Sequence, residues 1–208
     1  MSLTIIFIVL TIAASFYAWQ NHDVYSKWTM HPYSVNSHGE YWRFLTSGFV
    51  HADYSHLFFN MISFYFAGEG VENIYKQLLG DGKGEIFYVI LYLVGIIAAN
   101  IPGYLKHKDD SGYPGSIGAS GGVSAVMFAL ILFVPTTEVR VFFAIPMPAI
   151  VFAVLYLWSS QYMAKRNIFA GIDHQAHFWG AMFGVVFTII IYPEVITLYF
   201  LPSLQTWF

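Results

Sequence analysis

Long apolar runs separated by short polar turns make up most of this chain. Each of six runs has about the length with which an α-helix crosses a bilayer. Turn-rich polar segments such as 81–84 and 106–112 separate neighbouring runs. The pattern predicts an all-α polytopic membrane protein, a bundle of six antiparallel-connected transmembrane helices. The predicted helices lie at residues 2–19, 55–79, 85–105, 117–134, 143–163 and 174–192.

Composition supports a membrane as the solvent of this chain. Of the 208 residues, 57% are hydrophobic and 10% are charged, and the mean hydropathy is +0.58. Soluble domains carry about 25% charged residues. Because helices and short connections use nearly all of residues 1–208, we expect a single membrane-embedded domain. The first run lacks a preceding basic residue and a clear cleavage site, so it is interpreted as a span rather than a signal peptide.

Charge and cysteine content exclude some functions. The net charge of −3 gives no footprint for a nucleic-acid partner. The absence of cysteine excludes disulfides, thiolate metal sites and a cysteine nucleophile.

The segment from His22 to Tyr54 joins the first two predicted helices. It is rich in aromatic and polar residues, too long for a tight connection and too short for a domain. We expect it to lie in the membrane interface as a structured first loop.

Four polar side chains stand near the starts of the second, fourth and sixth predicted helices. In an alternating bundle these helices run in one direction, so their N-terminal ends share one face of the membrane. The helical rise places each group within roughly 10 Å of its helix start. Polar groups inside a membrane are costly and mark functional sites. The pattern predicts one water-accessible site built from His56, Asn60, Ser120 and His177.

Small residues beside Ser120 and His177 indicate how the fourth and sixth helices pack. Small side chains let membrane helices approach closely. The sixth helix carries Gly180, Ala181 and Gly184 after His177. The fourth helix carries Gly121, Ser124 and Ala125 beside Ser120. Packing of these two faces would bring the serine and the histidine together.

This pair suits acyl transfer. A serine hydroxyl becomes a nucleophile when a base takes its proton, and neutral imidazole is such a base near pH 7. The start of the fourth helix offers backbone N–H groups and the positive end of the helix dipole to a developing oxyanion. Asp173 lies four residues before His177. It is interpreted as the N-cap of the sixth helix rather than as a triad acid, so a Ser-His dyad is the more economical assignment.

With these motifs in order, the chain resembles the rhomboid family of intramembrane serine proteases. The similarity covers essentially the whole chain. It begins with Tyr-Trp-Arg at 41–43 and His51 in the long loop, and continues with the His-x-x-x-Asn pair at 56 and 60. Gly-x-Ser-Gly at 118–121 and His-x-x-Gly at 177–180 complete the set. Each motif is short, but their order and their placement on three alternate helices are specific.

The resemblance implies the six-transmembrane bacterial form: a rhomboid-like bundle with a long interfacial first loop. It implies a serine endopeptidase that hydrolyses peptide bonds in or near transmembrane segments of other membrane proteins. The expected partners are those transmembrane substrates and membrane lipid. No cofactor and no metal are expected. The implied location is the bacterial inner membrane, with the active site opening towards the outside.

The resemblance also assigns roles to residues. Ser120 would be the nucleophile and His177 the base. His56, Asn60 and the backbone around Gly118 and Ser120 would form the oxyanion and substrate-binding site. Glu72, near the far end of the second helix, would be structural. The residues expected to support the site are Trp42, Arg43, His51, Gly121 and Gly180.

Ser124 departs from the family pattern. Many rhomboids have a tyrosine four residues after the catalytic serine, and its ring packs on the catalytic imidazole. Two alternatives follow for this chain. Either another aromatic side chain fills that space, or the dyad is looser and slower.

Counting of basic residues disagrees with the resemblance on orientation. Loops on the side of the predicted site carry more Lys and Arg than those on the opposite side. By the positive-inside rule the dyad would lie on the cytoplasmic side. Rhomboids of this form place it towards the outside, and the prediction follows the family.

Two other classes of function remain as alternatives. A non-catalytic rhomboid-like protein would bind membrane clients without cutting them. A metal- or proton-handling protein would use the histidines, since imidazole is a common metal ligand. The sequence holds no His-Glu-x-x-His motif for such a site. Its candidate ligands are His51, His56, His174 and His177.

Overall fold

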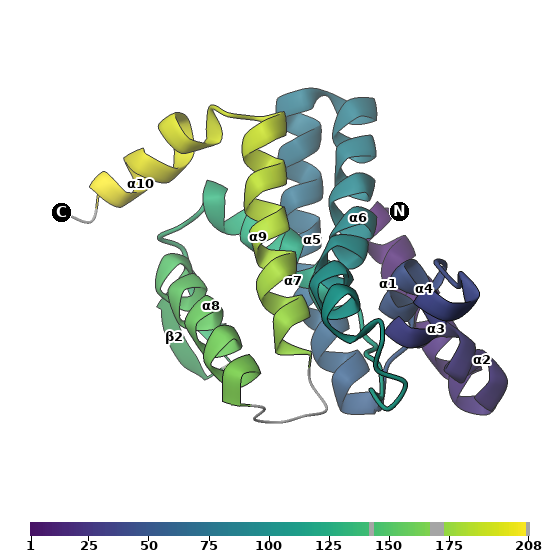
Figure 1. Cartoon of the computed structure of the whole chain (residues 1–208). Helices are drawn as coiled ribbons and strands as arrows, with labels where there is room; N and C mark the ends of the chain where they lie inside the picture. The colour runs from purple at the N-terminus through teal and green to yellow at the C-terminus, as the bar shows by residue number, and fades with distance from the viewer. Residues whose placement is uncertain (142–143, 167–172, 207–208) are drawn as a thin grey trace.

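The computed structural model describes residues 1–141, 144–166 and 173–206. It is mostly helical, with one two-stranded hairpin (Figure 1). Six long helices carry the fold: α1 (Leu3–Gln20), α5 (Tyr54–Leu79), α6 (Asp81–His107), α7 (Ser120–Phe133), α8 (Ala149–Arg166) and α9 (His174–Ile191). The shorter elements are α2 (His22–Trp28), α3 (Pro32–His38), α4 (Arg43–Thr46), η1 (Ser47–Phe49), β1 (Glu138–Val141), β2 (Ile145–Pro148), η2 (Val195–Phe200) and α10 (Leu201–Gln205).

Each long helix overlaps one predicted helix, and the structure is mostly helical, as the sequence predicted. Among the described residues, α1, α6 and α9 are long and apolar enough to cross a membrane. α7 is apolar but has only 14 residues, a length of about 21 Å against a hydrocarbon core of about 30 Å. These findings indicate an integral membrane protein, and the crossing of all six helices stays a prediction.

α9 packs against α6, α7 and α8, and in the view of Figure 1 it lies between α8 on one side and α5 and α6 on the other. The short helix α7 packs against α5, α6 and α9. The N-terminal end of α7, where Ser120 lies, is therefore surrounded by helices rather than exposed at the edge of the bundle.

The start predicted for the fifth helix was wrong. Position 143 lies outside the described residues, and the helix begins only at Ala149. Residues 145–148 instead form β2, which pairs antiparallel with β1 in the register Val141↔Ile145. Pro146 and Pro148 explain the difference, because proline lacks an N–H and disfavours helical backbone in the residue before it. The apolar run includes both prolines, but the helix begins only after the second one.

The first loop is structured, as expected, and Arg43 closes it. Arg43 is buried, and its Nη1 donates to the carbonyl oxygens of Ser26 at 2.6 Å and Thr29 at 2.7 Å. Its Nε donates to Glu40 at 2.6 Å. The last carbonyls of a helix have no helical partner, so the guanidinium satisfies the end of α2. Arg43 is thus a structural part of the loop and does not reach out to an interface.

Trp42 holds the same helix end from the surface. Its indole Nε1 donates to the carbonyl oxygen of Lys27 at 3.4 Å, and half of the residue is exposed. An aromatic body with one polar bond suits a membrane interface.

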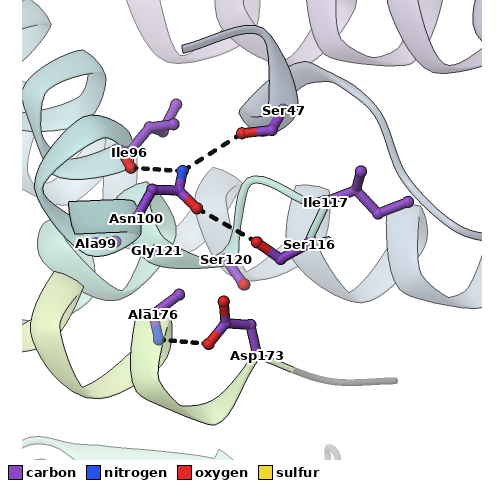
Figure 2. A pocket seen from close by; sticks show the side chains of 11 residues that line it. Ser47, Ile96, Ala99, Asn100, Ser116, Ile117, Ser120, Gly121, Asp173 and Ala176 are labelled. Atoms are coloured by element: carbon purple, nitrogen blue, oxygen red, sulfur yellow. Dashed lines mark hydrogen bonds between the residues drawn. The ribbon is translucent and has the colours of Figure 1, made fainter. Parts of the chain in front are cut away.

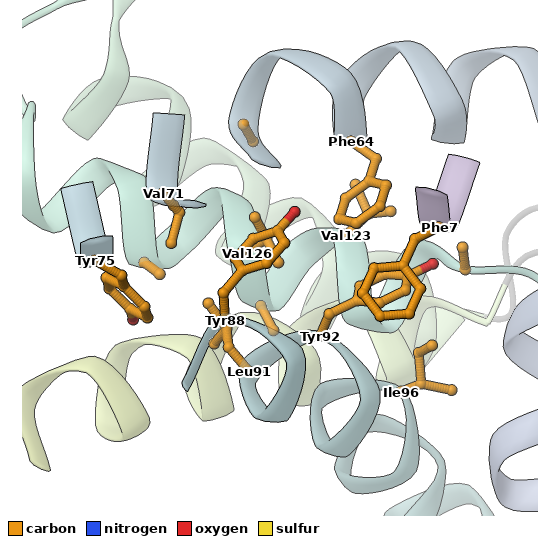
Figure 3. Close-up of a cluster of buried hydrophobic side chains, with 14 of the residues drawn as sticks. Phe7, Phe64, Val71, Tyr75, Tyr88, Leu91, Tyr92, Ile96, Val123 and Val126 are labelled. Atoms are coloured by element: carbon orange, nitrogen blue, oxygen red, sulfur yellow. The ribbon is translucent and has the colours of Figure 1, made fainter. Parts of the chain in front are cut away.

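Stacked aromatic rings fill the core between α1, α5 and α6 (Figure 3). The rings of Phe64 and Tyr92 stack with centroids 4.3 Å apart and planes 19° apart. Phe7 of α1 lies 4.9 Å from Tyr92. At the far end of the bundle the Tyr75 hydroxyl bonds to Thr188 Oγ1 of α9 at 2.7 Å. The core therefore ties the N-terminal helix to the central ones.

The seam between α7 and α9 consists of backbone against backbone. A methyl group at Gly180 would lie 2.2 Å from the carbonyl oxygen of Gly121. One at Gly184 would lie 2.0 Å from the carbonyl oxygen of Ala125. No side chain fits at either glycine, so the predicted packing of small-residue faces is confirmed.

Glu72 caps the first helix from inside the core. Its carboxyl oxygens accept hydrogen bonds from Leu3 N, Thr4 N and Thr4 Oγ1, each at 2.9 Å. Thr4 Oγ1 also bonds to the Tyr88 hydroxyl at 2.6 Å. The first N–H groups of a helix lack helical acceptors. Glu72 of α5 provides acceptors for two of them and so joins α1 to α5.

Replacing Glu72 with alanine should destabilise the fold. Two backbone N–H groups would lose their acceptor, at a cost of about 3 kcal/mol in the free energy of unfolding. Thermal unfolding in detergent measures the loss. Glu85→Ala is the matched control, because Glu85 is half exposed and pairs only with Lys76 in the described residues. An unchanged thermal midpoint in Glu72→Ala would contradict this role.

Candidate active site

Ser120 and His177 lie at the same end of the glycine seam. Ser120 is the first residue of α7, and His177 lies in the first turn of α9. The residue after Ser120 is in backbone contact with Gly180, one turn beyond His177. Within the described residues no hydrogen bond joins the Ser120 hydroxyl to the imidazole. Catalytic hydrogen bonds are often long in substrate-free enzymes and tighten when substrate binds.

The first loop fixes the backbone that leads into Ser120. The N–H of Gly118 donates to the carbonyl oxygen of Ser47 at 2.9 Å. The N–H of Ala119 donates to His51 Nε2 at 3.2 Å. Both bonds come from one short stretch of the loop, so this stretch sets where α7 starts.

His51 connects this backbone to α1. The ring is fully buried, and its Nδ1 lies 3.1 Å from Ser15 Oγ. Its carbonyl oxygen accepts from Trp19 Nε1 at 2.8 Å. Burial, with a smaller contribution from nearby His56, lowers the pKa of His51 to about 3. The imidazole is therefore neutral, and because Nε2 accepts from Ala119, its proton is on Nδ1.

The amides that follow Ala119 remain available to a ligand. The first helical bond of α7 runs from Val123 N to Ala119 O at 2.9 Å. The N–H groups of Ser120, Gly121 and Gly122 have no acceptor among the described residues, as is usual for the first turn of a helix. As in any α-helix, these N–H groups are directed towards the helix start, which is the positive end of the helix dipole. This turn can bind a developing oxyanion next to the Ser120 hydroxyl.

His56 lies directly over Gly118. Gly118 has φ +118, and a methyl group there would lie 2.6 Å from Cε1 and 2.7 Å from Nε2 of His56. Asp53 caps α5, accepting from His56 N at 2.9 Å, and this bond contributes most to lowering the pKa of the Asp53 carboxyl. The His56 imidazole thus lies against Gly118, which is two residues before Ser120, and so beside the open amides.

Asn60 lies one turn further along α5 and is buried. Its Nδ2 donates to the carbonyl oxygen of His56 at 3.0 Å. An amide nitrogen has two donors, so this bond leaves one N–H of Asn60 for another acceptor.

A small cavity, lined by both polar and apolar groups, adjoins Ser120 (Figure 2). It has room for about one water molecule. Asn100 Nδ2 donates to Ser47 Oγ at 3.3 Å, and Ser116 Oγ donates to Asn100 Oδ1 at 3.4 Å. Sequence reasoning missed these three residues. Asn100, a single amide inside an apolar run, was the signal that could have found them.

Asp173 is the N-cap of α9, as the sequence predicted. Its Oδ1 accepts from Ala176 N at 2.9 Å. The carboxyl also lines the cavity beside Ser120 (Figure 2).

An aromatic ring does pack on His177, and it comes from α8. The ring of Tyr156 stacks on the imidazole with centroids 5.9 Å apart and planes 22° apart. The Tyr156 hydroxyl lies 2.5 Å from Ser124 Oγ, in position for a hydrogen bond. Of the two alternatives that Ser124 left open, the first describes this structure.

The four candidate histidine ligands form two separate ring pairs. His51 contacts His56 at 5.0 Å between centroids, and His174 contacts His177 at 6.0 Å. In the described ranges no three His, Asp or Glu side chains gather into a metal-binding group.

Fold and site define a class: a helical membrane protein with a serine and a histidine at the ends of two closely packed helices. Residues 38–194 match the Rhomboid domain, so the chain belongs to the rhomboid family. It is 31% identical over 146 residues to RHOMBOID-like protein 12, mitochondrial, of Arabidopsis thaliana, covering 66% of this chain and 42% of that protein. It is 27% identical over 107 residues to Rhomboid protease GlpG of Klebsiella pneumoniae, covering 51% of this chain and 33% of that protein. The chain thus spans less than half the length of these curated relatives.

Gly118→Ala should disrupt the site more than backbone strain alone explains. A side chain at positive φ costs about 1–3 kcal/mol, and here it would also displace His56. Gly80→Ala is the matched control, since Gly80 has φ +85 with nothing within 4 Å. We expect both variants to lose stability and only Gly118→Ala to lose fluorophosphonate labelling of Ser120. Equal labelling in the two would contradict the contact between His56 and Gly118.

Proposed function

We propose that this protein is an intramembrane serine endopeptidase. It would use a Ser120–His177 dyad to hydrolyse peptide bonds in or near transmembrane segments of other membrane proteins, with residues 1–208 acting as one catalytic domain. The observation that carries the proposal is the start of α7. There a serine, open helix amides and a closely packed helix bearing a histidine meet in a chain of the rhomboid family.

The chemistry follows from these groups. His177 takes the proton of the Ser120 hydroxyl as its oxygen attacks the scissile carbonyl carbon. The carbonyl oxygen becomes an oxyanion, which accepts hydrogen bonds from the Ser120 amide, His56 and Asn60. Collapse breaks the C–N bond, and the imidazolium returns its proton to the leaving amine. Water, activated by the same imidazole, then hydrolyses the acyl-enzyme and regenerates Ser120.

A transmembrane substrate must unwind before it is cut. An intact helix hides its carbonyl groups in hydrogen bonds. Segments with glycine, proline or polar residues near the cut should be preferred, with a small side chain before the scissile bond as the family resemblance implies. Surrounding lipid is the second partner, and the mechanism needs neither metal nor cofactor.

We place the site on the outer side of a bacterial inner membrane. Burial of Arg43 weakens the opposing charge argument, because its guanidinium is paired inside the loop. When Arg43 is left out, the loops on the side of the site carry five basic residues and those on the opposite side carry three. They are Lys27, Lys106, Lys108, Lys165 and Arg166 against Lys76, Lys83 and Arg140. So small a difference gives little bias.

Ser120→Ala and His177→Ala should each abolish cleavage of a tagged single-span substrate by the purified protein in detergent. Both should keep the wild-type thermal midpoint. Fluorophosphonate should label the wild type and not Ser120→Ala. Ser203→Ala, a serine of α10 far along the chain from the dyad, is the matched control and should behave as wild type. A folded wild type that neither cuts nor labels would favour the client-binding alternative.

Asn60→Ala should lower kcat by an amount on the order of 10-fold to 1000-fold, the usual effect of removing one oxyanion donor. KM should change little, because the donor acts on the transition state. Asn36→Ala controls for loss of an amide, since Asn36 lies in α3 and bonds to Asp109. A fully active Asn60→Ala protein would remove Asn60 from the oxyanion site.

A further inference from the structure

We infer that Tyr156 of α8 is the positioning residue of the His177 imidazole, and that Ser124 of α7 holds Tyr156 in place. The inference rests on the proposed function and adds a residue to it. It starts from the contact of the two rings, 5.9 Å apart and inclined by 22°. Offset stacks of this kind are the favoured arrangement of aromatic pairs.

Tyr156 is itself held on several sides. Its hydroxyl lies 2.5 Å from Ser124 Oγ, and Ser124 is almost fully buried. The rings of Phe128 and Phe152 each lie 5.5 Å from its own. Packing and one hydrogen bond therefore leave the phenol ring little freedom, which is what a platform for another ring requires.

The platform serves His177 in two ways. It restricts rotation of an imidazole that has no hydrogen bond to a carboxylate among the described residues. It also offers a π face to the positive charge that His177 gains when it takes the proton of Ser120, within the roughly 6 Å over which such attraction acts. Tyr156 contacts neither proton nor scissile bond, so it positions the base and is not a catalytic residue.

Ser124 and Tyr156 are complementary in size. Ser124 lies one turn after Ser120 on α7, and its small side chain leaves the space that Tyr156 enters from α8. A tyrosine at 124 would compete for that space. The ring and the small residue can therefore be exchanged between the helices, and this exchange gives a sharp test.

The origin of the ring makes the dyad depend on α8. Only three residues of α8 are buried, Ala149, Ala153 and Ser160, while Val154, Leu155 and Trp158 are exposed. A displacement of α8 from α7 and α9 would carry Tyr156 away from the imidazole. The His177 imidazole is thus held in place only while α8 is packed against α7 and α9.

The experiment compares the wild type with five variants: Tyr156→Ala, Tyr156→Phe, Ser124→Ala, the exchange Ser124→Tyr/Tyr156→Ala, and Tyr162→Ala. Tyr162 is the matched control, because it is a half-exposed tyrosine on α8 that stacks on Trp158 instead. Three quantities are measured: the rate of fluorophosphonate labelling, kcat and KM for the single-span substrate, and the thermal midpoint.

We expect Tyr156→Ala to slow labelling and lower kcat by about 10-fold to 100-fold, the effect of a misplaced reacting group, with little change in KM. Tyr156→Phe and Ser124→Ala should each slow labelling by about 2-fold to 10-fold, the contribution of one hydrogen bond. In the exchange variant, the labelling rate and kcat should return to within about 10-fold of the wild-type values. Tyr162→Ala should label and cut at the wild-type rates.

Two failures are distinguishable. If the wild type neither labels nor cuts, the proposed function fails and this inference fails with it. If the wild type is active and a folded Tyr156→Ala labels at the same rate, only the positioning role is overturned. An exchange variant that has the wild-type thermal midpoint but labels no faster than Tyr156→Ala would also overturn it.

Discussion

The structure depends on the contact between two helix backbones at the glycine seam. At Gly180 and Gly184 of α9 no side chain fits, because the carbonyl oxygens of Gly121 and Ala125 of α7 occupy the space. Apolar side chains gain little from contact with one another in lipid, so close van der Waals approach is what holds helices together there. This approach also fixes how far His177 lies from Ser120. The packing contact and the relative placement of these two residues are therefore one constraint.

Hydrogen bonds made by the first loop decide which amides stay open at the start of α7. Ser47 and His51 accept from the amides of Gly118 and Ala119. That leaves the amides from Ser120 onward, with the side chain of the same serine beside them. A loop over 60 residues earlier in the chain thus satisfies the neighbouring amides and leaves free those that we propose as oxyanion donors, which suits a preorganised site.

Sequence patterns predicted what depends on spacing along one helix. The six helices, the small-residue seam and the cap at Asp173 all follow from local periodicity and end signals. Contacts between helices were harder to foresee. Nothing local marks Tyr156 as the partner of His177, because the two residues meet only once α8 packs on α9. Likewise, nothing local shows that Arg43 bonds to the carbonyl oxygens of Ser26 and Thr29, because these residues meet only in the folded loop. The roles assigned to the dyad and its donors stay predictions.

Polar residues in this apolar chain divide by whether the fold satisfies them. Arg43, His51, Glu72 and Asn100 are all bonded to backbone or side-chain groups that would otherwise be buried without a partner. Such groups are costly in a membrane unless they are paired. In the part of the chain that the structure describes, the Ser120 hydroxyl and the His177 imidazole make no hydrogen bond at all. The structural polar groups use their hydrogen-bonding capacity within the protein, whereas these two side chains remain free for the proposed reaction. Among the described residues, two core hydroxyls, Thr11 Oγ1 and Tyr92 OH, are also buried without a hydrogen bond, so an unsatisfied polar group marks a candidate site only together with its place at the helix starts.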